Sequence, residues 1–130
     1  MNEGLNQSMT KKELATSFLK LASSGKVREA YERHISPSFR HHNAYFKGDR
    51  DSLREAMEQD AAANPNKFLE VLHSVEEGNL VAVHSRVQRE KDGSDIAVVH
   101  IFRFEEDMIA ELWDVGQQAP TYSPNENGMF

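Results

Sequence analysis

The chain reads AVVHIFRF at residues 97–104 and IAELWDV at residues 109–115, with the acidic linker EEDM between them. Both runs are rich in β-branched and aromatic residues and contain neither Pro nor Gly, which is typical of buried β-strands. The first run carries His100 and the second carries Asp114. A buried acid beside a buried imidazole builds either a proton-transfer site or an ordinary structural hydrogen bond. Much of the functional interpretation therefore depends on how these two runs pair.

The register of this hairpin determines whether His100 and Asp114 share a face of the sheet. If paired residue numbers sum to 214, Arg103 faces Glu111, which is a favourable opposite-charge pair, and His100 faces Asp114. A slip of one residue would send the two side chains to opposite faces. Because the Arg103–Glu111 pair favours the even register, we expect His100 and Asp114 on one face.

The preceding run, LVAVHSRVQ at residues 80–88, extends the same antiparallel sheet. A register sum near 184 would set His84 opposite His100 and place Arg86 on the same face as Asp114. That face would combine apolar walls with a few polar groups, which is the character of a small-molecule pocket. Neither face has the composition of a plain solvent face, so we expect helices to cover one and a partner subunit or a curled sheet to cover the other.

Helical patterns precede the strands. A capping box at Thr10 and Glu13 begins a first helix, a second spans 26–34, and a third, capped by Asp51 or Ser52, runs to about Ala63. Strands are expected at 68–75, 80–88, 96–104 and 109–117, whereas 39–46 reads as a short extended or irregular segment. Helices followed by strands indicate an α+β fold. We expect a disordered leader over 1–9, a single domain over 10–119 and an irregular C-terminal tail over 120–130.

Composition narrows the class of protein. With 130 residues and 14.8 kDa, one domain is expected, and the absence of Cys excludes disulfides and thiolate zinc sites. The net charge of −6, with scattered basic residues, argues against nucleic acids and anionic membranes as partners. No apolar stretch is long enough to span a bilayer, and residues 1–12 lack the apolar core of a signal peptide. We therefore expect a cytoplasmic protein without nucleic-acid or membrane partners.

These residues together resemble the SnoaL-like polyketide cyclase family of the nuclear-transport-factor-2-like superfamily, and most of all its bacterial branch of predicted SnoaL-like aldol-condensation enzymes. The resemblance extends from about Leu14 to the C-terminus and is carried by short segments at 42–43, 81–85, 98–103, 111–115 and 127–130. It departs from that branch at Ala44, where a Pro is frequent, and at His100, where many relatives have Asp. The family implies a curved antiparallel sheet of four to six strands that wraps against N-terminal helices, forms a cone with an internal pocket and usually assembles as a homodimer.

The resemblance also implies a chemistry. Cyclases of this family close a ring by aldol condensation without a metal or organic cofactor; an acid at the position of Asp114 removes a proton from carbon, and a histidine at the position of His100 assists. Hydrogen-bond donors to the enolate oxygen are then expected among Asn43, His42 and His84. Five further residues are candidates for substrate contact or pocket wall, namely Arg86, Phe102, Trp113, Leu112 and Tyr45.

Three classes of function remain open on the sequence, the weakest being a protein-interaction scaffold that uses an apolar outer face of the sheet. The first is a cofactor-independent enzyme that abstracts the α-proton of a small carbonyl compound, as a cyclase or isomerase does. The second is a non-catalytic dimeric protein that holds a small apolar ligand in its pocket. His42, His84, His100 and Asp114 are metal-ligand types, but the chain has no HExxH-like spacing, so we expect neither metal nor cofactor.

Overall fold

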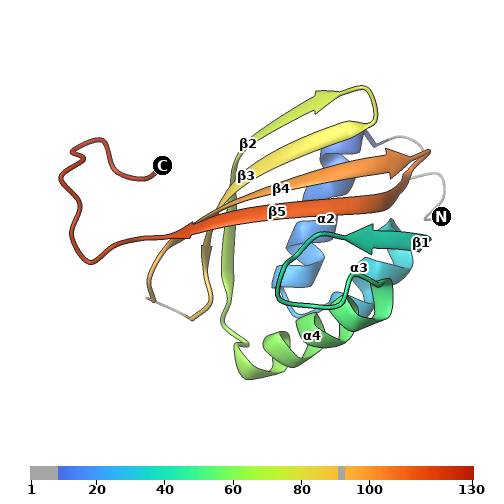
Figure 1. Ribbon diagram of the computed structural model, residues 1–130, viewed down its shortest axis with the longest axis horizontal. Coiled ribbons are helices and arrows are strands. Elements are labelled where there is room, and N and C mark those ends of the chain that lie inside the picture. The colour runs from blue at the N-terminus through green and yellow to red at the C-terminus, as the bar shows by residue number, and fades with distance from the viewer. Residues whose placement is uncertain (1–8, 91–92) are drawn as a thin grey trace.

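The computed structural model describes residues 9–90 and 93–130 of the chain (Figure 1). Its helices are α2 (Lys11–Ser23), α3 (Val27–His34) and α4 (Arg50–Ala63), and its strands are β1 (Ile35–His41), β2 (Phe68–Glu77), β3 (Leu80–Gln88), β4 (Ile96–Glu105) and β5 (Met108–Gln118). The sheet order is β1-β5-β4-β3-β2, antiparallel throughout except for β1, which runs parallel to β5. The predicted α+β class, with helices packed on a curved, mainly antiparallel sheet, is confirmed.

The predictions for the two ends of the chain, a disordered leader and an irregular tail, have different outcomes. Of the leader expected over 1–9, residues 1–8 lie outside the described part, and Met9 packs against the core. No helix or strand is found in residues 119–130, and the tail extends beyond the end of β5 before turning back (Figure 1). Its last side chain, Phe130, stacks against His84 with ring centroids 6.3 Å apart.

Helix starts follow local capping chemistry. The predicted capping box of α2 is confirmed, because Thr10 Oγ1 accepts from the Glu13 amide at 3.1 Å and the Glu13 carboxylate accepts from the Thr10 amide at 2.9 Å. The predicted cap of α4 was wrong by two or three residues. Asp49 has the extended backbone that an N-cap needs and accepts from the Ser52 amide at 3.0 Å, whereas Asp51 already lies inside the helix.

The segment expected to be irregular around 39–46 contains a strand that begins earlier. β1 spans Ile35–His41 and includes Pro37, which is tolerated because β1 is an edge strand and has a partner on one side only. The irregular part is the following loop, which leads back toward α4. β1 therefore brings this loop beside β5, since His41 pairs with Leu112.

The core lies between the helices and the inner face of the sheet, the face that the helices cover (Figure 1). Phe18 is at its centre, in edge-to-face contact with Tyr31 at 5.9 Å and with Phe102 at 6.0 Å between ring centroids. Buried apolar side chains from α2, α3, β3, β4 and β5 complete it, among them Leu14, Ala30, Val81, Val83, Phe104 and Ile109. One histidine, His34, is buried in this core at 1% exposure and shares a hydrogen bond of 2.9 Å with Ser17.

His34 should make the stability of the fold depend on pH. Burial, reinforced by the charge of Arg33, lowers the pKa of His34 to about 4 from 6.5. The unfolded chain binds a proton on His34 more readily than the folded chain does. The contribution of neutral His34 to the free energy of unfolding is therefore fully present above pH 6.5 and is lost as the pH falls toward 4. We expect His34→Gln to reduce the slope of unfolding free energy against pH by up to about 1.4 kcal/mol per unit in this window. Urea denaturation at several pH values measures this slope, and an unchanged slope would contradict the assignment.

The β4–β5 hairpin has the predicted register. His100 pairs with Asp114, Arg103 with Glu111 and Ile101 with Trp113. Arg103 Nε donates to Glu111 at 3.0 Å, which is the interaction from which the register was predicted. His100 and Asp114 therefore lie side by side on the inner face of the sheet.

The predicted register of the β3–β4 hairpin was wrong by one residue. Val83, not His84, pairs with His100, and His84 pairs with Val99. The shift places Val81 and Val83 on the inner face, where both are fully buried, and leaves His84 and Arg86 on the outer face. Burial of the β-branched residues against the helices favours this register, since it leaves the imidazole of His84 and the guanidinium of Arg86 on the outer face, in contact with water.

Glu111 forms an ion cluster on the outer face of β5. Its carboxylate accepts from Arg40 at 2.9 Å and from His42 at 2.6 Å, in addition to Arg103, so that only 7% of its side chain is exposed. The hydrogen bond from His42, followed by those from Arg40 and Arg103, lowers the pKa of Glu111 to about 2, although burial acts in the opposite direction. The cluster fastens the edge strand β1 to β5 and β4.

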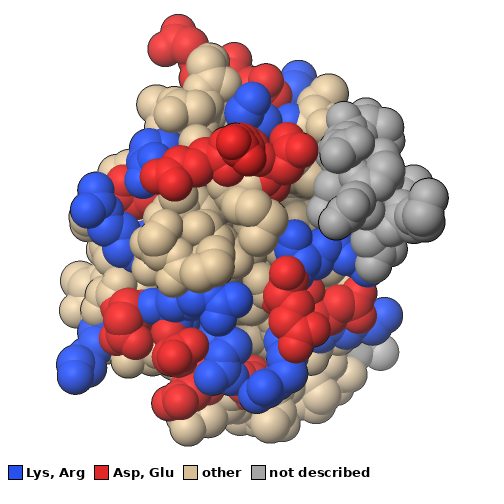
Figure 2. All heavy atoms as spheres, turned by 90° about the vertical axis from the view of Figure 1, so that its right-hand side faces the viewer, with Lys and Arg blue, Asp and Glu red and all other residues tan. Residues whose placement is uncertain are grey.

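Charges of both signs are mixed on the surface. Figure 2 shows the side of the molecule that lies on the right in Figure 1. On this side, basic side chains are interspersed with acidic ones, and there is no large area of a single charge. Among the described residues, no helix is long and apolar enough to cross a membrane.

Candidate functional site

A cavity with two adjoining compartments lies between the helices and the inner face of the sheet. The compartments have volumes of about 500 and 290 Å³. Both are lined by His100 and Asp114 from the sheet and by Leu19, Met57, Asp60 and Arg89. The larger one also contains Asn43, Tyr45 and Leu112, so five of the residues predicted for the site lie around one cavity.

Asp114 is half-buried and is held from the β1–α4 loop. Asn43 Nδ2 donates to both of its carboxylate oxygens, at 3.1 and 3.3 Å. The other end of the same amide, Asn43 Oδ1, accepts from the backbone amide of Tyr45 at 3.0 Å. Because each end of the side chain has a partner of matching type, the amide orientation is fixed and Asn43 presents its donors to Asp114.

The loop that carries Asn43 is held by a buried histidine. His41 Nδ1 accepts from the Asn43 amide at 3.1 Å, and its Nε2 lies 2.6 Å from the Lys47 carbonyl oxygen. With Nδ1 accepting, Nε2 carries the proton and donates to that carbonyl. His41 thereby bridges both ends of the loop and sets the position of Asn43.

His100 lies beside Asp114 but is not bonded to it in the described structure. Its ring stacks on Phe102 at 5.9 Å, and its Nδ1 is shut off from solvent with no partner among the described residues. Burial lowers the pKa of His100 to about 4, although the charge of Asp114 acts to raise it. The imidazole is therefore neutral at pH 7. With Nδ1 buried, Nε2 is the nitrogen that a ligand in the cavity can reach.

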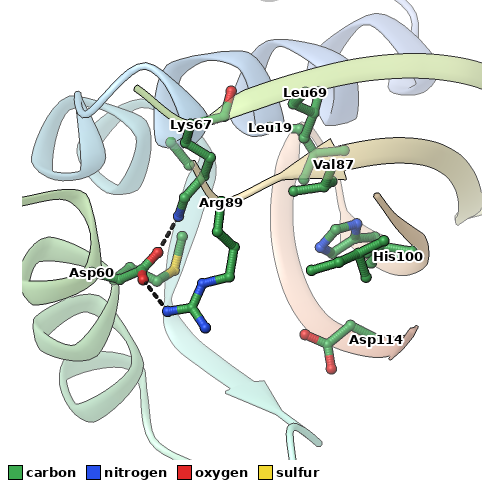
Figure 3. A pocket seen from close by; sticks show the side chains of 13 residues that line it. Leu19, Asp60, Lys67, Leu69, Val87, Arg89, His100 and Asp114 are labelled. Atoms are coloured by element: carbon green, nitrogen blue, oxygen red, sulfur yellow. Dashed lines mark hydrogen bonds and ion pairs between the residues drawn. The ribbon is translucent and has the colours of Figure 1, made fainter. Parts of the chain in front are cut away.

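The wall across from Asp114 carries a cluster that the sequence analysis missed. Asp60 on α4 accepts from Lys67, just before β2, and from Arg89, just after β3, at 2.6 Å for Arg89 (Figure 3). Burial raises the pKa of Asp60, but the hydrogen bonds from Lys67 and Arg89 outweigh it and hold the pKa below its usual value. A carboxylate on the otherwise apolar inward stripe of α4 is the sequence signal that could have revealed this cluster.

Several predicted site residues lie away from the cavity. His42 points to the outer face, where it bonds Glu111 and stacks on Trp113 with ring centroids 5.0 Å apart. Arg86 is also outside, with Nε 2.9 Å from Asp95 Oδ1. The expectation that His84 and Arg86 share a face with Asp114 was wrong because of the β3–β4 register. Phe102 faces inward but is fully buried beneath the cavity, in the core.

Metal-ligand residues do not gather in this region. Over residues 9–90 and 93–130, no group of three or more His, Asp or Glu side chains is placed to hold a metal ion. His84 forms a pair with His73 on the outer face, with the two Nδ1 atoms 3.0 Å apart.

Comparison with known proteins places this geometry in a fold family. A search of curated proteins gives no match. Among solved structures, an NTF2-like protein of unknown function from Cytophaga hutchinsonii has 17% identity and a TM-score of 0.69, covering 85% of this chain and 92% of that one. IdmH from Streptomyces antibioticus, described as "a putative polyketide cyclase", has 16% identity and a TM-score of 0.69, with coverages of 83% and 92%.

A third structure is AclR from Streptomyces galilaeus, with 21% identity, a TM-score of 0.71 and coverages of 82% and 88%. These likenesses establish the NTF2-like α+β fold. The profile of the SnoaL-like domain family matches residues 15–112, which includes most of α2, all of α3 and α4, the loop with Asn43 and most of the sheet. The chain therefore belongs to the SnoaL-like domain family.

Proposed function

We propose that this protein is a cofactor-independent enzyme that removes the α-proton of a small carbonyl compound, with Asp114 as the base. The observation that carries the proposal is the position of Asp114. Its carboxylate is half-buried, lines both compartments of the cavity and is oriented by Asn43. Membership of the SnoaL-like family and the likeness to IdmH support a cyclase-type or isomerase-type reaction.

In the proposed step, Asp114 takes the proton from the carbon next to the carbonyl group. The C–H electrons move into the carbonyl, which becomes an enolate whose oxygen needs a hydrogen-bond donor. His100 is suited to this task, because it is neutral, pairs with Asp114 on the neighbouring strand and, with Nδ1 buried, has Nε2 available to a ligand in the cavity. The tautomer with the proton on Nε2 leaves only a lone pair at the buried Nδ1, which costs less than a buried unpaired N–H.

Asn43 has a different part in this proposal from the one expected on the sequence. Its amide donors go to Asp114 and its oxygen to Tyr45, so it orients the base. An oriented carboxylate loses less freedom when the carbon acid binds, which favours proton transfer. We therefore assign Asn43 as a positioning residue and His100 as the donor to the enolate.

Hydrogen–deuterium exchange tests the proposal without knowledge of the natural substrate. A panel of cyclic and linear ketones and β-keto esters is incubated with the protein in D2O, and loss of the α-proton signal is followed by NMR. Exchange faster than in buffer, for at least one compound, supports proton abstraction. Absence of exchange for every compound that binds in the cavity would contradict it.

A non-catalytic pocket protein is the second candidate, favoured by the apolar walls of the cavity and by the saturation of Asn43 with protein partners. On this proposal, the Asn43–Asp114 pair is only a polar anchor for an apolar ligand. The exchange assay separates the two candidates, because a binder would hold a ketone without labelling it.

We further propose that the protein forms a homodimer through the outer face of the sheet. That face exposes several large apolar side chains, of which Val75 and Val115 are 65% and 66% exposed and Ile101 is 36% exposed. Exposed apolar patches of this kind mark interaction surfaces, and a second copy presents the same patch.

A charge at the centre of that face should separate the copies. We expect wild-type protein to have about twice the chain mass of 14.8 kDa by light scattering, and Ile101→Glu to have the mass of one chain. Tyr122→Glu in the tail, at a side chain that is 80% exposed, is the control and should remain dimeric. Wild-type protein that scatters as a single chain would contradict the dimer.

A further inference from the structure

The Asp60 cluster contains more positive than negative charge. Two cations, Lys67 and Arg89, share the single carboxylate of Asp60. This local surplus stands out in a chain with a net charge of −6 and in a cavity whose other wall already holds Asp114. A surplus cation in a partly enclosed cavity attracts an anion more strongly than one in open water does.

Arg89 is the member of the cluster that a ligand can contact. Its side chain is 61% exposed, whereas those of Lys67 and Asp60 are 20% and 25% exposed. Its Nη2 donates to Asp60, while its Nε and Nη1 make no hydrogen bond with any described residue. The planar fork of a guanidinium offers paired donors that match the two oxygens of a carboxylate.

The cluster lies at the far side of the same cavity from the proposed base. Figure 3 shows Arg89 and Asp60 on one side of the space and His100 with Asp114 on the other, and all four line both compartments. A ligand whose reacting carbonyl lies beside Asp114 therefore directs its other end toward Arg89.

We propose that Arg89, oriented by Asp60 and backed by Lys67, binds an anionic group of the ligand, so that the protein takes carbonyl compounds bearing a carboxylate. This inference rests on the proposed function of the cavity. It adds the class of compound and names Arg89 as the residue that determines specificity.

A purely structural role for the same cluster makes a different prediction. Asp60 also ties the end of α4 to the neighbouring ends of β2 and β3, so loss of Arg89 could act through stability alone. In that case Arg89→Gln would lower the melting temperature and weaken charged and neutral ligands equally. Selectivity for charge is therefore the measurement that separates the two roles.

The probes are 6-hydroxy-2-naphthoate and its neutral counterpart 6-hydroxy-2-naphthamide. Each is titrated into the full chain at pH 7 and followed by NMR shifts of the backbone amides of Asn43 and Ala56, which both line the larger compartment. We expect the acid to bind about tenfold more tightly than the amide, which is the typical effect of one hydrogen bond to a charged group. Arg89→Gln should bring the two affinities within about twofold of each other. Added salt should reduce the preference of wild-type protein, which keeps the inference testable even if the variant does not fold.

Arg28→Gln is the matched control. Arg28 is an exposed arginine that pairs with Glu58 at 3.3 Å and lines a different hollow, so its loss should leave the preference intact. Equal affinities of acid and amide for wild-type protein, or no binding of either probe, would overturn the inference. Neither of these binding results tests the role of Asp114, which is measured separately by hydrogen–deuterium exchange on neutral ketones.

Discussion

Asp114→Asn is expected to reduce α-proton exchange by about 10³-fold, because a general base contributes roughly 10²–10⁴-fold to such a step. The amide has nearly the same shape as the carboxylate but cannot take up the proton. Asn43 still has one oxygen to which it can donate, since Nδ2 reaches both carboxylate oxygens at 3.1 and 3.3 Å. The fold should therefore persist, with a melting temperature close to that of wild-type protein.

The control for this result is Asp107→Asn in the exposed turn between β4 and β5. It removes the same charge from the chain but lies far along the hairpin from the cavity. Exchange rates of the two variants are compared on the same ketone at the same pH. An Asp114→Asn protein that exchanges as fast as Asp107→Asn would show that Asp114 is not the base.

The His100–Asp114 pair could be predicted from the sequence because one charge pair fixed its register. Arg103 and Glu111 have opposite charges, and only the register that also sets His100 opposite Asp114 places them directly opposite each other. The β3–β4 hairpin has no pair of opposite charges that would select its register in the same way. Both faces of β4 are mainly apolar, so the alternation of side chains did not distinguish the predicted register from the observed one. Helix packing decided between them, and that is a tertiary effect which no local pattern contains.

The candidate site was predicted in part for the same reason. His42 and Asn43 are neighbours in the chain, yet His42 bonds Glu111 on the outer face and Asn43 bonds Asp114 at the cavity, so a motif that names both cannot tell which one enters the cavity. Asp60, Lys67 and Arg89 come from three separate elements and meet only when α4 lies across the ends of β2 and β3. The strand that carries Asp114 could be predicted from the sequence, whereas helix packing assembled the opposite wall of the cavity.

Phe102→Ala should have the largest effect on stability. Phe102 is fully buried, contacts Phe18 edge to face at 6.0 Å and lies under the His100 ring at 5.9 Å. Removing a buried phenyl ring leaves a cavity and costs about 3–5 kcal/mol. That is a large share of the roughly 5–15 kcal/mol by which domains of this size are stable. Urea denaturation measures the loss, with Phe130→Ala as the control, since Phe130 is 43% exposed in the tail.

Phe102→Leu separates the support of His100 from the stability of the core. Leucine keeps most of the apolar volume, so we expect a loss of about 1–1.5 kcal/mol and a folded protein. It does not keep the flat surface on which the His100 ring stacks at an angle of 14°. If that stacking holds Nε2 in place for the enolate oxygen, the leucine variant should exchange α-protons several-fold more slowly while its ligand affinity is unchanged. Exchange at the wild-type rate would mean that the strand backbone alone positions His100.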